Sequence, residues 1–543
     1  MGRSHRVFLT VASTMILALA PLAASADGAI EGTVTFWGDP GGGTQIEVGA
    51  HSEFFGPPDE SVFVNIPGGA YSIPPVPDGD YYIATVMSRD GYHGPPRPED
   101  VLAWYDADAD GEPDTVTVSG GTATGIDMDL GFVYVDVDAT GADDGSSWAD
   151  AFNDVQDGID LAVSGIDVWV AEGTYVPGAN RTDSFLPKPG VRVCGGFTGT
   201  ETIRTERDWS AHETILSGDI GAIGTHTDNC YHVVNTTGAN MTAVLDGFTI
   251  AHGYANGGGD FNNGGGILAF NGGVTVANSI VANNYATTYG GGIATTATGS
   301  VFVANSSLIN NQTPWHGGGL SLAANAGTPS TIVNCVFAGN SAWRGGGINV
   351  EGQVFAPGLE PILVNLSLSG NSAGGEGGGI HTNTTTFNPP GGAPVVIENS
   401  IVWGNGGLGL TSFGGSDVAV VNYSIVEGGW GGPGTNVLNV NPSFADAALR
   451  LNLDSPAIDA GDNAAVPLDT HDVDGDHPTD RQVGRDRDFN SRLVEIPYIP
   501  NTGNAAPGQP VIDLGAYEAF DPDLIFYDGF ESGDEYNWSG GAG

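Results

Sequence analysis

Residues 27–131 alternate apolar and polar side chains in short runs, at 30–36, 62–66, 81–86, 115–118 and 126–130. Turn-forming residues separate these runs, as in Gly-Asp-Pro-Gly at 38–41 and Pro-Asp-Gly-Asp at 77–80. A period of two is typical of strands with one buried face, and closely spaced turns are typical of antiparallel sheets. We therefore predict a small antiparallel β-sandwich over residues 27–131.

The pattern changes between residues 132 and 207. Short apolar runs at 133–136, 166–171 and 191–197 predict strands. Between the first two runs, apolar side chains recur every three or four residues, at Phe152, Val155, Ile159 and Ala162. This spacing predicts an amphipathic helix, and Ser147 and Asp150 are placed for a capping box at its start. A helix at this point would cover the open first coil of a repeat stack.

From residue 278 onward, one seven-residue string occurs five times. Its first copy is Asn-Ser-Ile-Val-Ala-Asn-Asn at 278–284, and the first Asn recurs after 27, 29, 31 and 34 residues. Four copies lead into a Gly-Gly-Gly triplet followed by Ile or Leu. A repeat this short cannot bury its own apolar face, so we predict a solenoid of stacked coils.

The pattern inside the repeat predicts where each side chain points. Position four is always large and apolar, so it should face the interior with position two, whereas position three should face outward. Like residues on stacked coils should form rows, in which an Asn amide can bond the coils above and below. Asn also tolerates the left-handed backbone of a corner, and the Gly triplets fit a second corner. The predicted rows are Asn278, Asn305, Asn334, Asn365 and Asn399, and Asn284, Asn311, Asn340, Asn371 and Asn405.

Several ordered motifs carry a resemblance to a known family. They are Ala-Thr-Gly-Ala-Asp-Asp-Gly-Ser-Ser-Trp-Ala-Asp-Ala-Phe at 139–152, Val-Trp-Val-Ala-Glu-Gly-Thr-Tyr at 168–175, Ser-Pro-Ala-Ile-Asp-Ala-Gly-Asp-Asn at 455–463 and Asp-Leu-Gly-Ala-Tyr-Glu at 513–518. Residues 132–519 resemble secreted bacterial proteins with repeats of the polymorphic outer membrane protein type, which implies a right-handed parallel β-helix. The triplet here is Gly-Gly-Gly where the chlamydial members have Gly-Gly-Ala.

The amino-terminal module has its own resemblance. Ile-Glu-Gly-Thr-Val at 30–34, Pro-Asp-Gly-Asp-Tyr-Tyr-Ile at 77–83 and Ile-Asp-Met-Asp-Leu at 126–130 are similar to carboxypeptidase regulatory-like modules. That resemblance implies a spacer or a binding appendage. The expected fold class is therefore all-β, with a right-handed parallel β-helix preceded by a small antiparallel β-sandwich.

The predicted organisation has five parts. Residues 1–26 read as a signal peptide, with Arg3 and Arg6 before an apolar stretch and Ala-Ser-Ala at 24–26. The sandwich at 27–131, the β-helix with its capping helix at 132–445, a closing segment at 446–519 and a tail at 520–543 follow. The tail is either a sorting signal or a strand that completes the last coil. We expect a secreted protein, extracellular or on the bacterial surface.

Charge excludes several partners. The chain has 64 acidic and 15 basic residues and a net charge of -49, and Arg344 is the only Lys or Arg between Arg207 and Arg450. Nucleic acid binding needs clustered cations, so we exclude it, and no segment of the mature chain is apolar over about 18 residues, the length of a membrane span. Cys194 and Cys230 either form a disulfide or remain, with Cys335, as buried thiols.

Two acidic clusters are candidates for calcium. The first is Asp106, Asp108, Asp110 and Asp114, with Gly111 permitting a sharp turn. The twelfth position of an EF-hand loop is Thr117 here, so the bidentate carboxylate is missing, and the alternative is a solvated acidic turn. The weaker cluster is Asp472, Asp474, Asp476 and Asp480.

Catalytic constellations are not evident in the sequence. A lyase needs a base and cations, and a hydrolase needs paired carboxylates, but no acid recurs at a fixed repeat position. We interpret His252, His316 and His381 as polar surface residues. The tryptophans at Trp315, Trp343, Trp403 and Trp430 either pack at loop bases or stack on sugars.

We therefore expect a non-catalytic protein with an adhesive, structural or binding role, whose partners are surface glycans or proteins. The first alternative is a carbohydrate-active enzyme, either a polysaccharide lyase or a hydrolase, or a carbohydrate-binding protein. A second alternative is a calcium-stabilised scaffold. No cofactor is expected to be required, calcium excepted.

Overall fold

The computed structural model describes residues 27–38, 45–53, 57–88, 100–323, 328–351, 359–383, 394–413, 419–471, 473, 482–488, 490–494, 496, 498–506 and 509–521. The predicted signal peptide, the second acidic cluster and the tail beyond Asp521 lie outside the described residues. Among the described residues, no helix is both long enough and apolar enough to cross a membrane.

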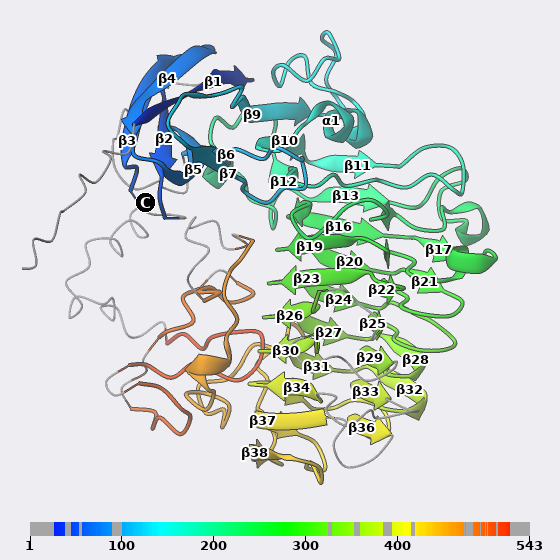
Figure 1. Ribbon diagram of the computed structural model, residues 1–543. Coiled ribbons are helices and arrows are strands. Elements are labelled where there is room, and N and C mark those ends of the chain that lie inside the picture. The colour runs from blue at the N-terminus through cyan, green and yellow to red at the C-terminus, as the bar shows by residue number, and fades with distance from the viewer. Residues whose placement is uncertain are drawn as a thin grey trace, which may run out of the picture.

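The amino-terminal part is a β-sandwich (Figure 1). One sheet contains β1 (Gly28–Trp37), β4 (Gly68–Val76), β8 (Ala123–Thr124) and β9 (Met128–Val135). The other contains β2 (Gln45–His51), β3 (Glu60–Asn65), β5 (Gly79–Met87), β6 (Val101–Trp104) and β7 (Thr115–Val118), all paired antiparallel. The alternating positions of these strands form one buried core, as the period of two predicts.

Strand β9 belongs to both the sandwich and the coils. Its first half pairs in parallel with β1, as β8 does, so the sandwich is not purely antiparallel as predicted. Residues Gly131–Val135 pair in parallel with β10 (Ile166–Ala171). Trp169 and Phe197, both fully buried, stack at 4.8 Å in the core that the sandwich shares with the first coils. The two regions therefore share one continuous sheet.

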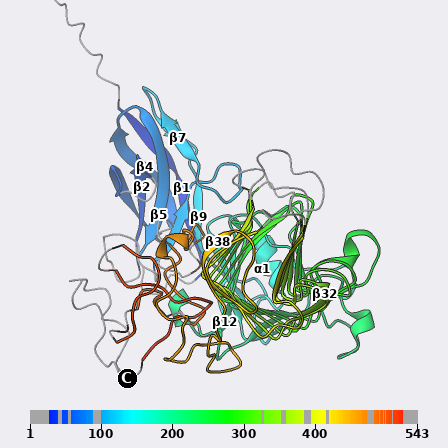
Figure 2. The same ribbon diagram turned by 90° about the horizontal axis from the view of Figure 1, so that it is seen from below.

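Parallel ladders of strands form the coils (Figure 2). The first ladder contains β10, β12 (Arg192–Phe197), β15 (Val244–Asp246), β19 (Gly273–Ala277), β23 (Ser300–Ala304), β26 (Thr331–Val333), β30 (Ile362–Val364), β34 (Val395–Glu398), β37 (Ala419–Val426) and β38 (Gly434–Leu438). The second contains β11 (Gly173–Tyr175), β13 (Thr214–Ser217), β16 (Phe248–Ala251), β20 (Ile280–Ala282), β24 (Ser307–Ile309), β27 (Val336–Ala338), β31 (Ser367–Ser369) and β35 (Ile401–Val402). The third contains β14 (Val234–Asn235), β18 (Ile267–Phe270), β22 (Ile293–Thr296), β25 (Leu320–Ala323), β29 (Ile348–Glu351), β33 (Ile380–Asn383) and β36 (Leu410–Phe413).

Short elements complete the turns between ladders. Two pairs of strands lie in one turn region, β17 (Tyr254–Ala255) with β21 (Tyr285–Ala286), and β28 (Ser341–Arg344) with β32 (Ser372–Glu376). The 3₁₀ helices are Arg204–Glu206, His226–Asp228, Gly259–Asn262 and Asn463–Ala465. The molecule is a right-handed parallel β-helix with a preceding sandwich, so the predicted fold class is confirmed.

The single α-helix among the described residues, α1 (Val155–Leu161), covers the first coil. Val155 and Ile159 are buried in the core that fills the solenoid, and Figure 2 shows α1 within the outline of the coils. The capping box was wrong: Asp154 is the N-cap, and its carboxylate accepts from the backbone N–H of Gln156. Ser147 and Asp150 bond each other in a turn that precedes the helix.

The side chains that fill the interior of the solenoid come from the same repeat position on each coil. Position four is fully buried in the solenoid core in every copy, at Val281, Leu308, Phe337, Leu368 and Val402. Position three points outward as predicted, but residues 446–519 cover it along most of the stack. Ile401 packs against Ala457 and Leu514, and Val336 packs against Tyr517. Figure 1 shows this segment, coloured orange to red, lying beside the coils.

The two asparagine rows have different structures. In the second row, each amide Nδ2 donates to the Oδ1 of the next coil, from Asn284 through Asn405, over 2.8 to 3.1 Å. The first row has positive φ angles of 48° to 55° in all five copies, as a corner requires. The second row does not adopt this conformation. The residue before it does, at Asn283, Asn310, Gly339, Gly370 and Gly404.

The first row is only partly a ladder. Asn334 and Asn365 each donate to the Asn of the preceding coil, at 3.0 and 2.9 Å, and Asn278 donates to Asp246 there at 2.7 Å. Asn278, Asn334 and Asn399 also donate to the carbonyl oxygens of Val473, Arg485 and Asp462. This row therefore helps to hold residues 446–519, which we call the covering segment. At the other corner, Gly290 has a φ of 59°, and a Cβ there would lie 2.0 Å from the Ile293 carbonyl oxygen.

The three cysteines are free and buried, so Cys194 and Cys230 form no disulfide. Burial raises the pKa of each thiol to about 12, which keeps all three protonated and unreactive.

Candidate functional site

The residues that directly precede the Gly triplets form a column along one turn. Tyr289, His316, Arg344 and Glu376 occupy this position on four successive coils. Bridges join Tyr289 to His316 and His316 to Arg344, and Arg344 pairs with Glu376 in the β28–β32 ladder. Side chains about 30 residues apart in the sequence thereby become neighbours, at the coil spacing of about 4.8 Å.

Two polar pairs lie in and beside this column. His316 Nδ1 lies 2.5 Å from Glu351 Oε2, which comes from the outward side of β29. Arg344 Nε lies 3.5 Å from Glu376 Oε2, an ion pair without hydrogen-bond geometry. The hydrogen bond from His316 is the main reason why the pKa of Glu351 is lowered. Arg344 and Glu376 offset each other's charge, and both pairs present polar atoms at the surface.

His381 lies beneath this surface on β33. Its side chain is fully buried, its Nδ1 lies 2.8 Å from Thr411 Oγ1, and its Nε2 has no hydrogen-bond partner among the described residues. Burial, and then the charges of Arg344 and His316, lower its pKa to about 4, so it is neutral at pH 7. The interpretation of His316 and His381 as surface residues was wrong, because both are less than 9 % exposed.

Two tryptophans on adjacent coils flank the column. Trp315 is 56 % exposed and Trp343 is 50 % exposed. The backbone N–H of Trp343 donates to the backbone carbonyl oxygen of Trp315 over 2.8 Å. A Cβ at Gly374 or at Gly375 would lie 3.0 Å from the Trp343 ring. The indole therefore lies over this glycine backbone on the next coil, with its other side toward solvent.

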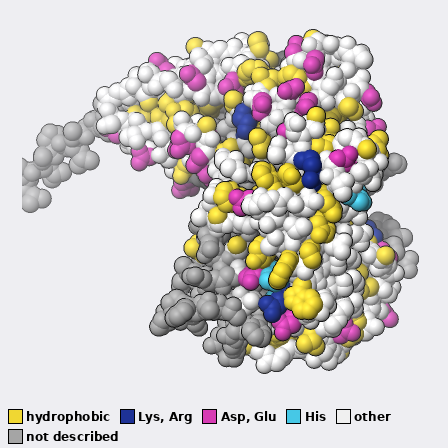
Figure 3. Space-filling view, turned by 90° about the vertical axis from the view of Figure 1, so that its right-hand side faces the viewer, with side chains coloured by type: hydrophobic (Ala, Val, Ile, Leu, Met, Phe, Trp, Pro, Cys, Tyr) yellow, Lys and Arg dark blue, Asp and Glu magenta, His cyan; other side chains and the backbone are white. Residues whose placement is uncertain are grey.

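We call the surface formed by Trp315, Trp343, Arg344, Glu351 and Glu376, with the buried His316 beneath it, the tryptophan face. Figure 3 shows apolar, basic, acidic and histidine side chains gathered on the lower half of this side of the molecule. Trp403 and Trp430 differ from the two exposed tryptophans, because they are partly buried and pack against apolar clusters. Trp403 and Trp430 therefore pack as the first alternative predicts, whereas stacking of Trp315 and Trp343 on sugars stays a prediction.

Three carboxylates of the first acidic cluster converge. Oxygens of Asp106, Asp108 and Asp114 lie within 4.8 Å of one another, whereas Asp110 is not part of this group. Carboxylate oxygens suit calcium, but calcium takes six to eight oxygen ligands. Backbone N–H groups of Gly111 and Ala107 already donate to Asp106 and Asp114 over 2.8 Å. Calcium binding here stays a prediction.

The acidic loop also joins the two regions of the molecule. The carbonyl oxygen of Asp110 accepts hydrogen bonds from Asn240 Nδ2 and Thr242 Oγ1 of the β-helix. Thr117, at the twelfth loop position, lies in β7 and donates to Asp80 over 2.6 Å. An ion in this loop would therefore stiffen a contact between the sandwich and the coils.

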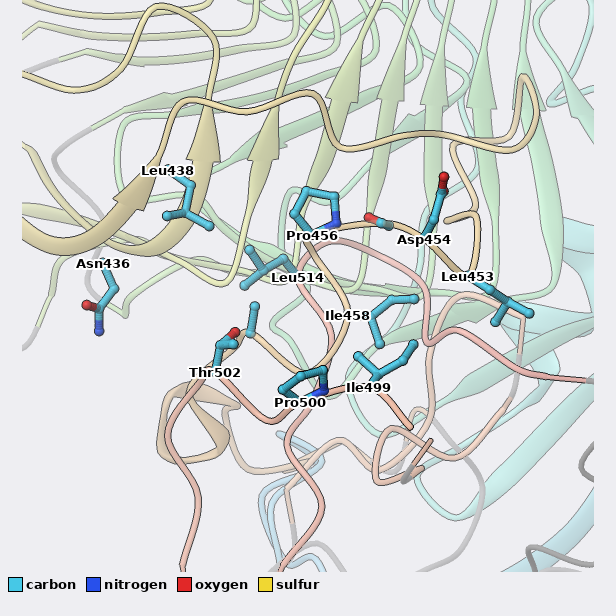
Figure 4. Close-up of a pocket in the computed structure, with 12 residues that line it drawn as sticks. Asn436, Leu438, Leu453, Asp454, Pro456, Ile458, Ile499, Pro500, Thr502 and Leu514 are labelled. Atoms are coloured by element: carbon cyan, nitrogen blue, oxygen red, sulfur yellow. The ribbon is translucent and has the colours of Figure 1, made fainter. Parts of the chain in front are cut away.

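A pocket of about 510 Å³ lies between β38 and the covering segment (Figure 4). Its wall is mostly apolar, and Figure 4 shows Ile458 and Ile499 close together, with Asn436 and Asp454 at the margins. The carboxylate of Asp454 already accepts from Ser443 Oγ over 3.0 Å. Asp454 is the one titratable residue in this wall, so the pocket offers no pair of groups for acid–base chemistry.

No family model matches the chain, and no curated protein is similar to it. One similar solved structure is described as "Crystal structure of pectate lyase Pel9A", with 12 % identity and a TM-score of 0.32. The similarity covers 72 % of this chain and 96 % of the other.

The sequence analysis named Trp315 and Trp343 but missed the column beside them, although a signal for this column is present. Tyr, His, Arg and Glu stand before otherwise constant Gly-Gly-Gly triplets. A search for identical residues does not detect this position, because a different residue stands there in every copy. Aligning the repeats by their glycines and then reading the variable position downward finds the column.

Proposed function

We propose that this protein binds carbohydrate at the tryptophan face without turning it over. The observation that carries the proposal is the flat, half-exposed Trp343 indole over Gly374 and Gly375. The C–H face of a sugar ring packs well on such a surface, because an indole combines a large apolar area with little conformational freedom to lose. Glycines beneath the ring fix its orientation before a ligand arrives.

The polar side chains around the two rings support this proposal. Sugar sites combine an apolar contact surface with a few polar groups that fix orientation. Glu351, His316, Arg344 and Glu376 provide carboxylate and N–H groups beside the rings. Sugar hydroxyls both donate and accept, so they are suitable partners for these pairs.

The setting of this activity remains as the sequence indicates. We propose secretion and an adhesive or display role at a bacterial surface, supported by the amino-terminal pattern and by the resemblance to polymorphic outer membrane protein-type repeats. The sandwich is proposed as a spacer of the carboxypeptidase regulatory-like kind. The shared strand β9 supports a fixed rather than a flexible spacer.

Affinity electrophoresis of the full chain in gels containing single polysaccharides tests the binding. Trp343→Ala and Trp315→Ala should each weaken binding about tenfold or more, equivalent to about 1.4 kcal/mol. Phe63→Ala is the matched control, since Phe63 is a 43 % exposed aromatic residue on the sandwich. Equal retardation of the tryptophan variants and the parent protein would refute the proposal. Release of unsaturated or reducing ends would establish the enzyme alternative instead.

We also infer a weak, stabilising calcium site at Asp106, Asp108 and Asp114, supported by the convergence of their oxygens. Extracellular calcium modules bind at about 0.1 to 1 mM, so several millimolar calcium should stabilise the protein by about 1 kcal/mol. The measurement is the thermal midpoint with calcium and with chelator. Asp108→Asn should abolish the difference, and a midpoint insensitive to chelator in the parent protein would remove the site.

A further inference from the structure

Aromatic side chains continue from the tryptophan face along the axis of the solenoid. Tyr254 and Tyr285, paired in the β17–β21 ladder, stack with ring centroids 4.6 Å apart. Tyr289 lies on the same coil as Tyr285, and its ring is 5.7 Å from that of His316. Figure 3 shows the resulting apolar stripe running down this side of the molecule.

This stripe repeats with the period of the coils. Tyr254, then Tyr285 with Tyr289, then Trp315 and finally Trp343 lie on four successive coils. At a strand spacing of about 4.8 Å, four coils extend over roughly 14 Å. Tyr289 is in register with His316, next to Trp315, whereas Tyr254 and Tyr285 are in register with Gln312, three residues before Trp315. A single terminal sugar would contact only one step of this series, whereas a chain that runs along the axis would contact several.

The net charge of the protein indicates which class of polysaccharide this face can bind. The molecule has a net charge of -49, and Arg344 is the only Lys or Arg from residue 208 to residue 449. Arg344 is paired with Glu376, and His316 is paired with Glu351. Arg181, beside Tyr254, donates to the Tyr254 carbonyl oxygen and to the Asn256 side chain. An anionic polymer would therefore meet a negative field in which the cations already have partners.

We propose that this face binds an uncharged linear polysaccharide whose chain runs parallel to the solenoid axis, with about one sugar unit on each coil. The proposal rests on the carbohydrate binding proposed above and adds the class of polymer and its direction.

The aromatic residues have different tasks in this arrangement. Trp343 and Trp315 offer ring surface to solvent and provide the stacking. Tyr254 and Tyr285 cover each other's faces, so they present ring edges and hydroxyl groups. The tyrosines therefore matter for hydrogen bonding, and only when the ligand is long enough to reach their coils from the tryptophans.

Calorimetry of the full chain with neutral oligosaccharides of two to eight units tests this arrangement. The probes are β-1,4-linked glucan, mannan and xylan series, with polygalacturonate and alginate as charged polymers. Affinity should rise with length up to about four units and then level off. Tyr285→Phe, which keeps the ring stack, should weaken binding several-fold for four units or more and leave the shortest ligands unchanged. Trp343→Ala should weaken binding at every length.

The outcomes separate this inference from the proposed function. An affinity that is constant from two units upward, tighter binding of the charged polymers, or no binding of any neutral series overturns the axial arrangement. If Trp343→Ala still abolishes binding in the first two cases, carbohydrate binding stands without it. If the Trp343→Ala and Trp315→Ala variants bind oligosaccharides with the same affinity as the parent protein, both proposals are refuted.

Discussion

Two outer faces of the same coils differ in whether another segment of the chain covers them. On the face formed by β24, β27, β31 and β35, the outward residues Ser307, Val336, Ser367 and Ile401 are at most 5 % exposed, because residues 446–519 cover them. On the tryptophan face, Trp315 and Trp343 remain half exposed or more. A solenoid offers equivalent backbone on every side, so the difference lies in what the chain places opposite each face.

The covered face is built for attachment of a segment. The backbone N–H of Ala516 donates to Ser367 Oγ over 3.0 Å, and Arg487 Nε donates to Ser307 Oγ over 3.1 Å. These bonds satisfy polar atoms that the cover would otherwise bury without partners. The described part of the chain places no equivalent segment on the tryptophan face, where glycines keep an aromatic ring outward. This contrast predicts that changes on the first face affect folding and that changes on the second affect binding.

The strongest way to break the cover is to remove Arg492. Its guanidinium is 2 % exposed and donates to the carbonyl oxygens of Asp513 and Gly515, beside the buried carboxyl group of Glu518. Arg492→Met should lower the free energy of unfolding by about 3–5 kcal/mol, since a buried cation and its bonds are lost. Denaturant unfolding and limited proteolysis of residues 446–519 measure the effect.

Arg450 provides the matched control for Arg492. It pairs with Asp446 and Asp488 at the surface and is 46 % exposed, so Arg450→Met should cost at most about 1 kcal/mol. Equal losses for the two variants would show that the buried cluster does not hold the cover.

The second asparagine row is the next most sensitive feature. Asn340 Oδ1 accepts from both the backbone N–H and the amide of Asn311, and its Nδ2 donates to Leu308 and Asn371. Asn340→Ala should cost about 2–4 kcal/mol, because it leaves buried donors without acceptors. Asn305→Gly, in the first row, keeps the left-handed corner and should cost less than half as much in denaturant unfolding. The reverse order would contradict the roles assigned to the rows.

Repeated positions explain how far the sequence could predict this structure. Position four is apolar in every copy, so the stack, its interior and the rows of Asn followed from the pattern alone. The cover did not, because residues 446–519 contain no repeat and contact side chains more than 100 residues earlier, as Ala516 does at Ser367. The charged column was also missed, since its residues differ from copy to copy and become neighbours only in coil register.

Lowering the pH should stabilise the packing of residues 446–519 on the coils. Burial raises the pKa of Asp513 to about 7 and also raises that of Glu518 and of Asp486. A carboxyl group with a higher pKa in the folded protein stabilises the fold fully below its unfolded pKa of about 4, and this contribution is lost as the pH rises to 7. Unfolding free energy should therefore fall by about 2–3 kcal/mol between pH 5 and pH 8.

Asp513→Asn isolates this carboxyl group. The variant keeps the shape of the side chain but cannot ionise, so its loss of stability over the same pH interval should be smaller than that of the parent protein. Parallel curves for the two proteins would assign the pH dependence to other groups.

The smallest expected effect on stability is also the most informative about the second face. Trp343→Ala should change the free energy of unfolding by less than about 0.5 kcal/mol, because half of the indole is already in water and no segment of the described chain packs over it. Leu514→Ala, on the covering segment, should cost about 2–5 kcal/mol, since Leu514 is 1 % exposed against Ile401. A ring that contributes little to folding yet is held flat by two glycines is what the proposed carbohydrate binding requires. If Trp343→Ala proved as destabilising as Leu514→Ala, the indole would be part of the core, and the contrast between the two faces would disappear.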